Sequence, residues 1–241
     1  GGDPIALEDV NLVVMNAGER HQIKMLAKLP IQYGDGLKMI MDFKGALEKP
    51  TEIKGTLFVE GKNVKPTELM SAYLPFDIGM TTGAADIKAW GQWQHARLVS
   101  VKFDTHIRQA VFTRKAKANF HINHLDAQVN WRIKDQQWQL DINRFLLEIA
   151  EANNKSSKKL PDTIVSIATD IQFQKLKMYA KQLDLAEAAK LTQFFAPLSD
   201  EQSKLIGQSQ VSGLIKDFSL YAEPDNKSFA LAGWFDSINI G

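Results

Sequence analysis

The five histidines are the residues of this chain best suited to bind a metal or to move protons near neutral pH. His121 and His124 are three apart on an expected strand, so their side chains should project to opposite faces and cannot share a metal ion. His21, His95 and His106 stand alone and belong to no HxxxH pattern. The spacing therefore predicts no metal site, and solvated or singly hydrogen-bonded histidines are the favoured interpretation.

Two short motifs resemble catalytic or phosphate-binding signatures but fail in their context. The stretch "GQSQV" (207–211) begins like the Gly-x-Ser-x-Gly turn of a hydrolase, but Val211 replaces the second glycine. The stretch "YGDG" (33–36) precedes an expected strand, so no helix N-terminus is offered to a phosphate. Acidic residues mostly occupy polar strand positions, where solubility explains them better than acid–base chemistry. We therefore expect no enzymatic activity, no catalytic residues and no cofactor.

Composition removes further classes of function. The chain of 241 residues has no cysteine, which excludes disulfides, thiolate zinc sites and cysteine nucleophiles. Lysine and arginine total 29 against 28 acidic residues, a balance that argues against a nucleic-acid partner. Five tryptophans suit a sugar-binding face or ordinary packing, and packing is the commoner role on strands. The longest uncharged stretches, about a dozen residues, are too short to span a bilayer.

The elements that must position these residues are mainly strands. In "KAKANFHINHLDAQVNWRI" (115–133), apolar and polar residues alternate, break once, and alternate again. Such alternation gives a strand one apolar face, which something must cover. Short turns such as Ala17-Gly18-Glu19 separate most segments, as in an antiparallel meander. The expected strands span residues 10–16, 20–29, 37–47, 52–60, 85–93, 98–107, 109–122, 126–133 and 137–149.

Two segments have helical rather than strand character. Pro66 near the start of "KPTELMSAYLPF" and three-to-four apolar spacing predict a short helix near 66–74. A longer helix is expected over 183–207, with Asp184 and Glu187 forming a capping-box-like start. Pro197 should end or kink that helix, after which Ser199 can cap a second short turn.

A polar, basic stretch at 151–162 predicts an exposed loop that divides the chain. It separates a β-meander over 1–150 from a second β unit over 163–241, which closes with a hairpin. Both units contain the order strand, helix, glycine, strand. This order indicates a weak internal repeat with Gly83 and Gly213 at corresponding positions.

The apolar positions of the central strands form a candidate ligand-binding face. From the residues alone, a closed sandwich that buries this face is favoured over an open groove. A closed sandwich could be a carbohydrate-binding module or a hydrolase. The candidate face comprises Leu57, Val59, Ile87, Ala89, Val101, Phe103, Phe120, Ile122, Val129, Trp131, Leu140 and Ile142.

The block "PIALEDVNLVVMNAGERHQIKMLAKLPIQYGDGLKMIMDFKG" (4–45) resembles a block of the YhdP family, large AsmA-like proteins of Gram-negative bacteria. Its order is a Pro-Ile-x-Leu lead, an Asn-x-Gly turn, Arg-His opening the return strand, Leu-Pro, Gly-Asp-x-Leu and a "DFKG" ending. The downstream pieces "TLFVEGKNVKPTELMSAYLPF", "LDLAEAAKLTQFF" and "GLIKDFSLYAEPDNKSFALAGWFDSINIG" are similar to the family in the same order. The resemblance covers most of the chain.

The resemblance implies a long curled antiparallel sheet with an open apolar groove and one or two short helices. It also implies a periplasmic segment of an inner-membrane-anchored protein that carries phospholipid acyl chains toward the outer membrane and supports its lipid homeostasis and permeability barrier. Docking proteins at either membrane are possible partners, and membrane contact would come from other parts of the parent chain. The family offers no catalytic residues, and its groove reverses the preference for a closed sandwich. An envelope scaffold that binds a protein partner through the same groove is the alternative.

Overall fold

The computed structural model describes residues 6–46, 48–65, 77–115, 117–134, 136–150, 157–160, 162–170, 172, 174–196 and 198–239. The helical segments are η1 (Pro50–Glu52), α2 (Leu185–Phe195), α3 (Asp200–Gln208) and η2 (Pro224–Asn226). The strands are β1 (Glu8–Ala17), β2 (Arg20–Lys28), β3 (Gly36–Lys44), β4 (Lys54–Val64), β5 (Ile78–Gln94), β6 (Arg97–Arg114), β7 (Phe120–Lys134), β8 (Gln137–Ala150), β9 (Ser157–Lys159), β10 (Val165–Asp170), β11 (Leu176–Asp184), β12 (Ser212–Glu223) and β13 (Ser228–Asn239).

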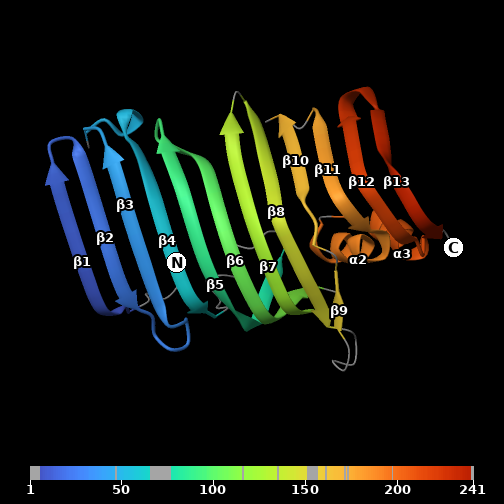
Figure 1. Ribbon diagram of the computed structural model, residues 1–241, viewed down its shortest axis with the longest axis horizontal. Helices are drawn as coiled ribbons and strands as arrows, with labels where there is room; N and C mark the ends of the chain where they lie inside the picture. The colour runs from blue at the N-terminus through green and yellow to red at the C-terminus, as the bar shows by residue number, and fades with distance from the viewer. Residues whose placement is uncertain are drawn as a thin grey trace.

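The strands form one antiparallel sheet in which sequence neighbours are spatial neighbours (Figure 1). The order runs from β1 to β8 and on through β10 to β13, while the short β9 pairs with β8. Within the described strands, β1 and β13 do not pair with each other, so the sheet is open. The accessible surface is 15560 Å², against about 10,800 Å² for a compact protein of this mass. The open antiparallel sheet that the family resemblance implies is confirmed, and the closed sandwich favoured by the residues alone is wrong for the described strands.

The first hairpin shows how local sequence sets the register. Gly18 and Glu19 form a two-residue turn, with Gly18 at φ +59, and Ala17 pairs with Arg20 across it. A positive φ in such a turn matches the right-handed twist of the flanking strands. This turn pairs even-numbered residues of β1 with odd-numbered residues of β2, such as Val14 with Ile23, which fixes the faces of both strands.

The strand expected over 109–122 is wrong. Instead, β6 continues through Gln109 to Arg114, and β7 begins at Phe120. Gln109 adopts a φ of +49, which interrupts the alternation without ending the strand. Arg114 is the last residue of β6, and the lysines that follow it, Lys115 and Lys117, lie between the two strands.

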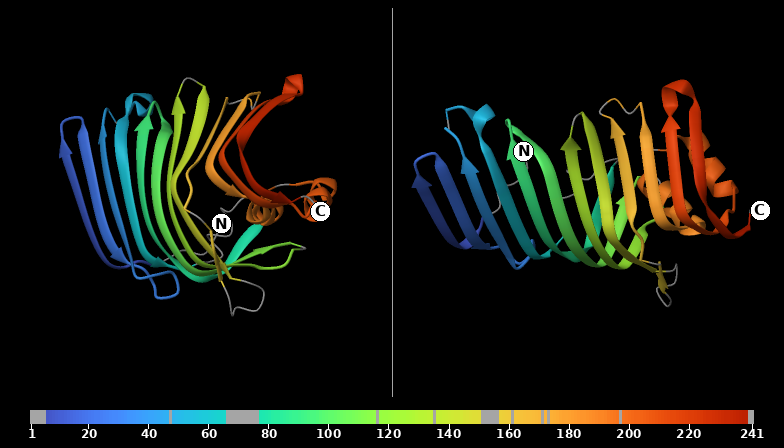
Figure 2. Two further views of the ribbon diagram at one scale, coloured as in Figure 1. Left: turned by 45° about the vertical axis from the view of Figure 1, so that its right-hand side comes forward. Right: turned by 45° about the horizontal axis from the view of Figure 1, so that its top comes forward.

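Two similar irregularities bend the sheet, one between β5 and β6 and one between β12 and β13. Gly83 in β5 has φ +121 and Gly213 in β12 has φ +124. At both glycines the register advances two residues on one strand and three on the next. The extra residue across the sheet, Gln109 or Ser237, has a positive φ in each case. The two glycines predicted to correspond therefore occupy equivalent β-bulges, which increase local twist and bending (Figure 2).

The helical region over 183–207 contains two helices rather than one. Asp184 caps α2 by accepting a hydrogen bond from the Glu187 amide, at 3.1 Å. Ser199 and Gln202 form a reciprocal capping box at the start of α3, as the sequence predicts for a second turn. The helices lie on the inner side of the curl (Figure 2).

Two expected segments lie partly or wholly outside the described residues. The helix near 66–74 is one of them. Of the loop expected over 151–162, residues 157–159 are strand β9, and Leu160 is 7% exposed within a hydrophobic cluster. The expected exposed loop is therefore wrong for this described part. The C-terminal hairpin of β12 and β13 is confirmed.

Candidate functional site

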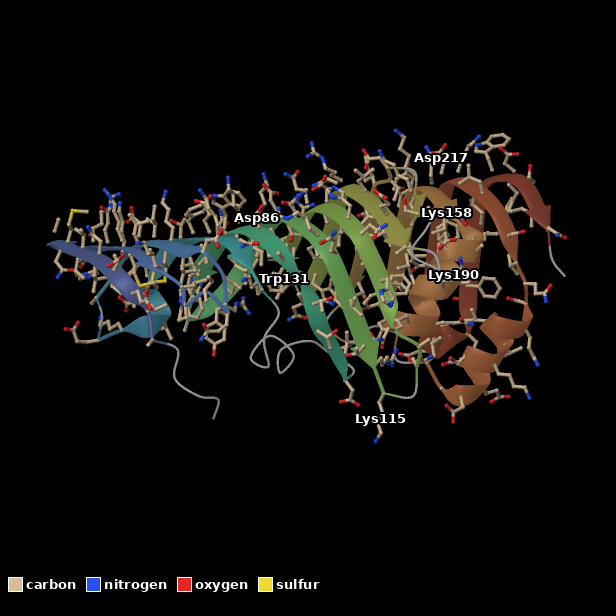
Figure 3. All side chains as sticks on the ribbon, turned by 90° about the horizontal axis from the view of Figure 1, so that it is seen from below. Asp86, Lys115, Trp131, Lys158, Lys190 and Asp217 are labelled. Carbon is tan, nitrogen blue, oxygen red and sulfur yellow. The ribbon has the colours of Figure 1, made fainter. Side chains whose placement is uncertain are left out.

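The two faces of the sheet differ in chemistry: one carries continuous apolar rows, and the other carries most of the cross-strand ion pairs. We call the face that carries Trp131 the inner face and the face that carries Asp86 the outer face. Figure 3 shows these two residues on opposite sides of the sheet, with the helices on the side of Trp131. The inner face is the only one of the two that the described helices contact.

A row of cross-strand neighbours on the inner face runs through Trp131 and crosses twelve strands without a charged or polar side chain. We call it the Trp131 row. Its residues pair directly with one another across the sheet. The row comprises Val14, Ile23, Met41, Leu57, Gly91, Val101, Trp131, Leu140, Ile167, Met178, Leu220 and Leu231.

A parallel row through Val129, the Val129 row, lies two residues further along each strand and is equally apolar. It crosses eleven strands, from β1 to β12. Together the two rows make a continuous apolar band on the inner face. The Val129 row comprises Leu12, Met25, Met39, Val59, Ala89, Phe103, Val129, Ile142, Val165, Ala180 and Phe218.

Over β1–β8 most residues of these rows are only partly shielded. In the middle of the band, the side chains of Trp131, Val129 and Leu140 are each intermediate in exposure. On the edge strand β1, Leu12 and Val14 are 57% and 56% exposed. Neighbouring side chains of the same sheet account for the shielding, because no described helix or second sheet packs over this part of the band. A large apolar surface left in this state marks a binding surface.

The bent ends of β5–β8 are different, because helix α2 packs on them. Leu147 is 1% exposed and Phe194 of α2 is 5% exposed in one cluster, which also includes Phe112 and Ile149. The rings of Phe194 and Phe195 lie 5.3 and 5.4 Å from that of Phe120. A smaller cluster joins the start of α2 to β11 and β12. The band is thus closed by a packed core at one side and open along β1–β8.

Basic residues of the β6–β7 turn hold α2 in place. Arg114 donates hydrogen bonds to the carbonyls of Phe194 and Ala196, the latter at 2.8 Å. Lys117 Nζ lies 2.7 Å from the carbonyl of Gln193. Cations near a helix C-terminus satisfy its last carbonyls and its dipole. Arg114 and Lys117 thus anchor the end of the helix that covers the core.

The outer face is a ladder of charges suited to water. Arg20 and Asp42 pair at 2.6 Å, and Arg108 and Asp86 pair at 2.7 Å, both across neighbouring strands. The hydrogen bond from Arg20 lowers the pKa of Asp42 to about 2. The hydrogen bond from Arg108 likewise lowers the pKa of Asp86. These carboxylates are ionised at neutral pH, so the outer face stays hydrated.

The family follows from a comparison with known proteins. The family model described as YhdP protein matches residues 2–241. The chain belongs to the YhdP family. Comparison with curated proteins and with solved structures finds no match for it. YhdP proteins are AsmA-like proteins of the cell envelope and are not known for an enzymatic activity.

In this YhdP-family chain, the twelve predicted face residues all lie on the inner face, in two settings. Ten of them lie in or beside the two rows, over the open part of the band. Phe120 and Ile122 instead pack under α2, with Ile122 only 4% exposed. A bulge at Asn123 accounts for their orientation, because Ile122 pairs with Ile149 while His124 pairs with Glu148. The break in the sequence alternation is this bulge.

The tryptophans of the YhdP-family chain do not form one sugar-binding platform. Trp93, Trp131 and Trp138 share the inner face, whereas Trp90 and Trp234 lie on the outer face. Trp90 stacks at a tilt on Phe58 at 5.4 Å, and Lys102 lies over its ring. Packing explains this outer tryptophan better than a sugar does.

A charged cluster at the start of α2 has a structural role. Glu187 is 2% exposed, and its Oε1 accepts from Lys158 at 3.1 Å and from Lys190 at 2.9 Å. Lys158 also contacts Asp184, so strand β9 is tied to the helix start.

No helix in the described part of the chain has the length and apolar character to cross a bilayer.

Sequence reasoning missed a cluster of histidines on the outer face. His106 does not stand alone: its Nδ1 lies 2.6 Å from Asp126 Oδ1, and His124 Nε2 lies 2.9 Å from Asp126 Oδ2. Burial raises the pKa of Asp126, but hydrogen bonds with both histidines lower it by more. The pattern His124-x-Asp126 was the available signal, since residues two apart share a strand face.

Proposed function

We propose that this chain is a segment of a periplasmic lipid-transfer protein that carries phospholipid along its inner face between the inner and outer membranes. The observation that carries the proposal is the unbroken Trp131 row, which crosses twelve strands without a polar side chain. A path for acyl chains must be apolar over its full length, because each buried unpaired polar group costs several kcal/mol, roughly 2–7. The charged outer face keeps the other side of the sheet in water.

The dimensions of the band support a lipid passenger. Neighbouring strands lie about 4.8 Å apart, so the open part of the band over the eight strands β1–β8 spans roughly 34 Å. The hydrocarbon core of a bilayer is about 30 Å thick, so an acyl chain is about half that length. A phospholipid could therefore occupy several successive positions along the band, as transport along a path requires.

The proposal places the segment in the periplasm of a Gram-negative envelope, with membrane anchoring supplied by other parts of the parent protein. The family assignment supports an envelope setting. Docking proteins at the two membranes, as the sources and acceptors of lipid, belong to the same proposal. Transport to the outer membrane would maintain its permeability barrier.

A second candidate function is an envelope scaffold that holds a protein segment against the same face. The edge strands favour it, because β1 and β13 expose apolar side chains beside unpaired backbone groups, including Leu12, Val14 and Leu231. Such edges can accept an added strand. The third possibility considered from sequence, a closed sandwich, is excluded for the described strands by the open sheet.

Photo-crosslinking at adjacent residues tests the proposal. A photo-reactive amino acid at Val129 or Trp131, in cells, should capture phospholipid. The matched controls are Asn130 and Arg132, whose side chains lie on the outer face of the same strand and should capture none. Capture of protein alone at Val129 would favour the scaffold. Equal lipid capture at Val129 and Asn130 would overturn the groove.

A charge placed in the band gives a second readout. Val129→Asp should impair outer-membrane barrier function, because the carboxylate would be desolvated among acyl chains. Asn130→Asp adds the same charge to the outer face and should be nearly silent. Circular dichroism of both purified variants checks that each keeps its β-structure. Barrier defects of equal size in the two folded variants would contradict the proposal.

A further inference from the structure

Three side chains on the outer face converge on one point. The ligand-type atoms of His106, His124 and Asp126 all lie within 4.8 Å of one another. Each oxygen of Asp126 faces a different imidazole nitrogen, at 2.6 Å for His106 Nδ1 and 2.9 Å for His124 Nε2. The two rings meet edge to face, with centroids 4.6 Å apart and an interplanar angle of 72°. Both rings therefore present nitrogens to one carboxylate without stacking on each other.

The sheet itself holds these side chains in position. His106 of β6 pairs directly with Asp126 of β7, and His124 lies two residues before Asp126 on the same strand face. The bulge at Asn123 puts His124 on the outer face, whereas the unbroken alternation from Ile122 would turn it inward. Side chains on paired strands make more precise sites than side chains on loops.

We propose that His106, His124 and Asp126 bind a zinc ion on the outer face. Imidazole nitrogen with carboxylate oxygen is a ligand set that zinc accepts, at about 2.0–2.2 Å per bond. Tetrahedral bonds of that length put ligand atoms roughly 3.3 Å apart. The nitrogen–oxygen distances are shorter than this, so a small outward rotation of the side chains admits the ion.

The site is accessible and has room for a fourth ligand. The three side chains are 36%, 28% and 28% exposed, so an ion can enter from solvent. Asp86, the cross-strand neighbour of His106, is already engaged by Arg108 and by the amide of Asn63. Water completes a three-ligand zinc site when no fourth side chain does. The bound zinc would tie β6 to β7 beside the bend, on the side away from the lipid path.

Zinc titration of the tag-free, chelator-stripped 241-residue chain tests this site. Calorimetry should show one zinc bound per chain, and magnesium should not compete because it prefers oxygen ligands. Cobalt should give visible d–d bands without thiolate charge transfer, since the chain has no cysteine. His106→Gln, His124→Gln and Asp126→Asn should each abolish the one-to-one step.

The matched control is His95→Gln, an exposed histidine in the β5–β6 turn, which should bind zinc like the parent chain. Circular dichroism selects the variants that keep the β-type spectrum, and Asp126→Asn, nearly isosteric, preserves packing best. A simple hydrogen-bonded triad predicts no one-to-one step in the folded parent chain. That result, or a zinc step that persists in folded Asp126→Asn and His124→Gln, overturns the proposal. Neither outcome bears on the proposed lipid path, because the histidines lie on the opposite face of the sheet.

Discussion

The inner face is apolar at the middle of the central strands and at their bent ends, yet the two regions are built differently. At the bent ends Leu147 is 1% exposed beneath α2. In the middle Trp131 and Leu140 are only partly shielded, and no described element lies over them. The same alternation produces a packed core in one region and an accessible band in the other. An apolar strand face therefore does not define what covers it.

The bulges and the helix anchor account for the difference. Irregular residues at Gly83, Gln109 and Asn123 fall on three neighbouring strands and bend the sheet toward α2. Arg114 and Lys117 then bind the end of that helix. A helix can thus cover the apolar face where the strands bend toward it and where residues at the end of β6 bind it. The open region of the band has neither feature.

Truncating one leucine in each region should give the largest difference between them, measured as the loss of unfolding free energy. Leu147→Ala leaves a cavity in the packed cluster and should cost about 2–5 kcal/mol of unfolding free energy. Leu140→Ala, the matched change in the open band, should cost about 1 kcal/mol, since its side chain is already partly exposed. Urea unfolding measures both. Equal losses would show that the open band is packed after all.

Substitution of the glycines in the two bulges should give the next largest loss of stability. Gly83→Ala puts a Cβ 2.8 Å from Ala110 Cα at φ +121, so strain of about 1–3 kcal/mol is expected. Gly213→Ala meets Ser237 O at 2.8 Å and should behave alike. The control is Gly36→Ala, whose Cβ approaches no atom nearer than 3.5 Å. If Gly83→Ala is as mild as Gly36→Ala, the bend does not depend on the bulge.

Release of the helix tether should have a smaller and more local effect. Arg114→Gln removes charged hydrogen bonds to two carbonyls and should cost about 1–2 kcal/mol. Amide exchange in α2 should accelerate, while exchange in β2 and β3 of the open region stays unchanged. Lys115→Gln is the control, because Lys115 is exposed in the same turn. Uniform acceleration over the whole sheet would contradict a local tether.

The sequence predicts well which residues lie on the inner face of the sheet. It predicts poorly which element packs over that face, and the reasons are physical. Alternation has a period of two, so positions such as Leu57, Val101 and Trp131 follow from local pattern alone. Phe120 and Ile122 share the inner face only because a bulge shifts their parity, and the helix that covers them, α2, begins more than 60 residues later. The bulge is visible in the sequence as a break in the alternation, but the break does not predict the helix that covers these residues, and a distant helix leaves no periodic signal.

The same limit explains the histidine cluster. His106 and Asp126 are 20 residues apart, and they meet only because β6 and β7 adopt one particular register. A motif search over short spacings does not find such a pair. The closer pair, His124 and Asp126, was visible as His-x-Asp on a strand. Register is the missing information for the pair of His106 and Asp126, since one residue of slip reverses every face.

The smallest expected effect concerns the outer face of the open region and depends on pH. The pKa of Asp42 is about 2 in the folded chain against an ordinary value of 3.8, chiefly because Arg20 donates to it. A lowered pKa means that this pair stabilises the fold above about pH 4 and that the contribution is lost as the pH falls toward 2.

Arg20→Gln should raise the pKa of Asp42, which can be read from its carboxyl carbon by NMR. Because Gln22 also donates to Asp42, only the additional change Gln22→Leu should restore the ordinary value. The side chains of Arg20 and Asp42 are 51% and 28% exposed, so solvent screens the pair and the unfolding free energy at pH 7 should change little. A pKa of Asp42 unmoved by Arg20→Gln would show that the ladder of charges is not formed in solution.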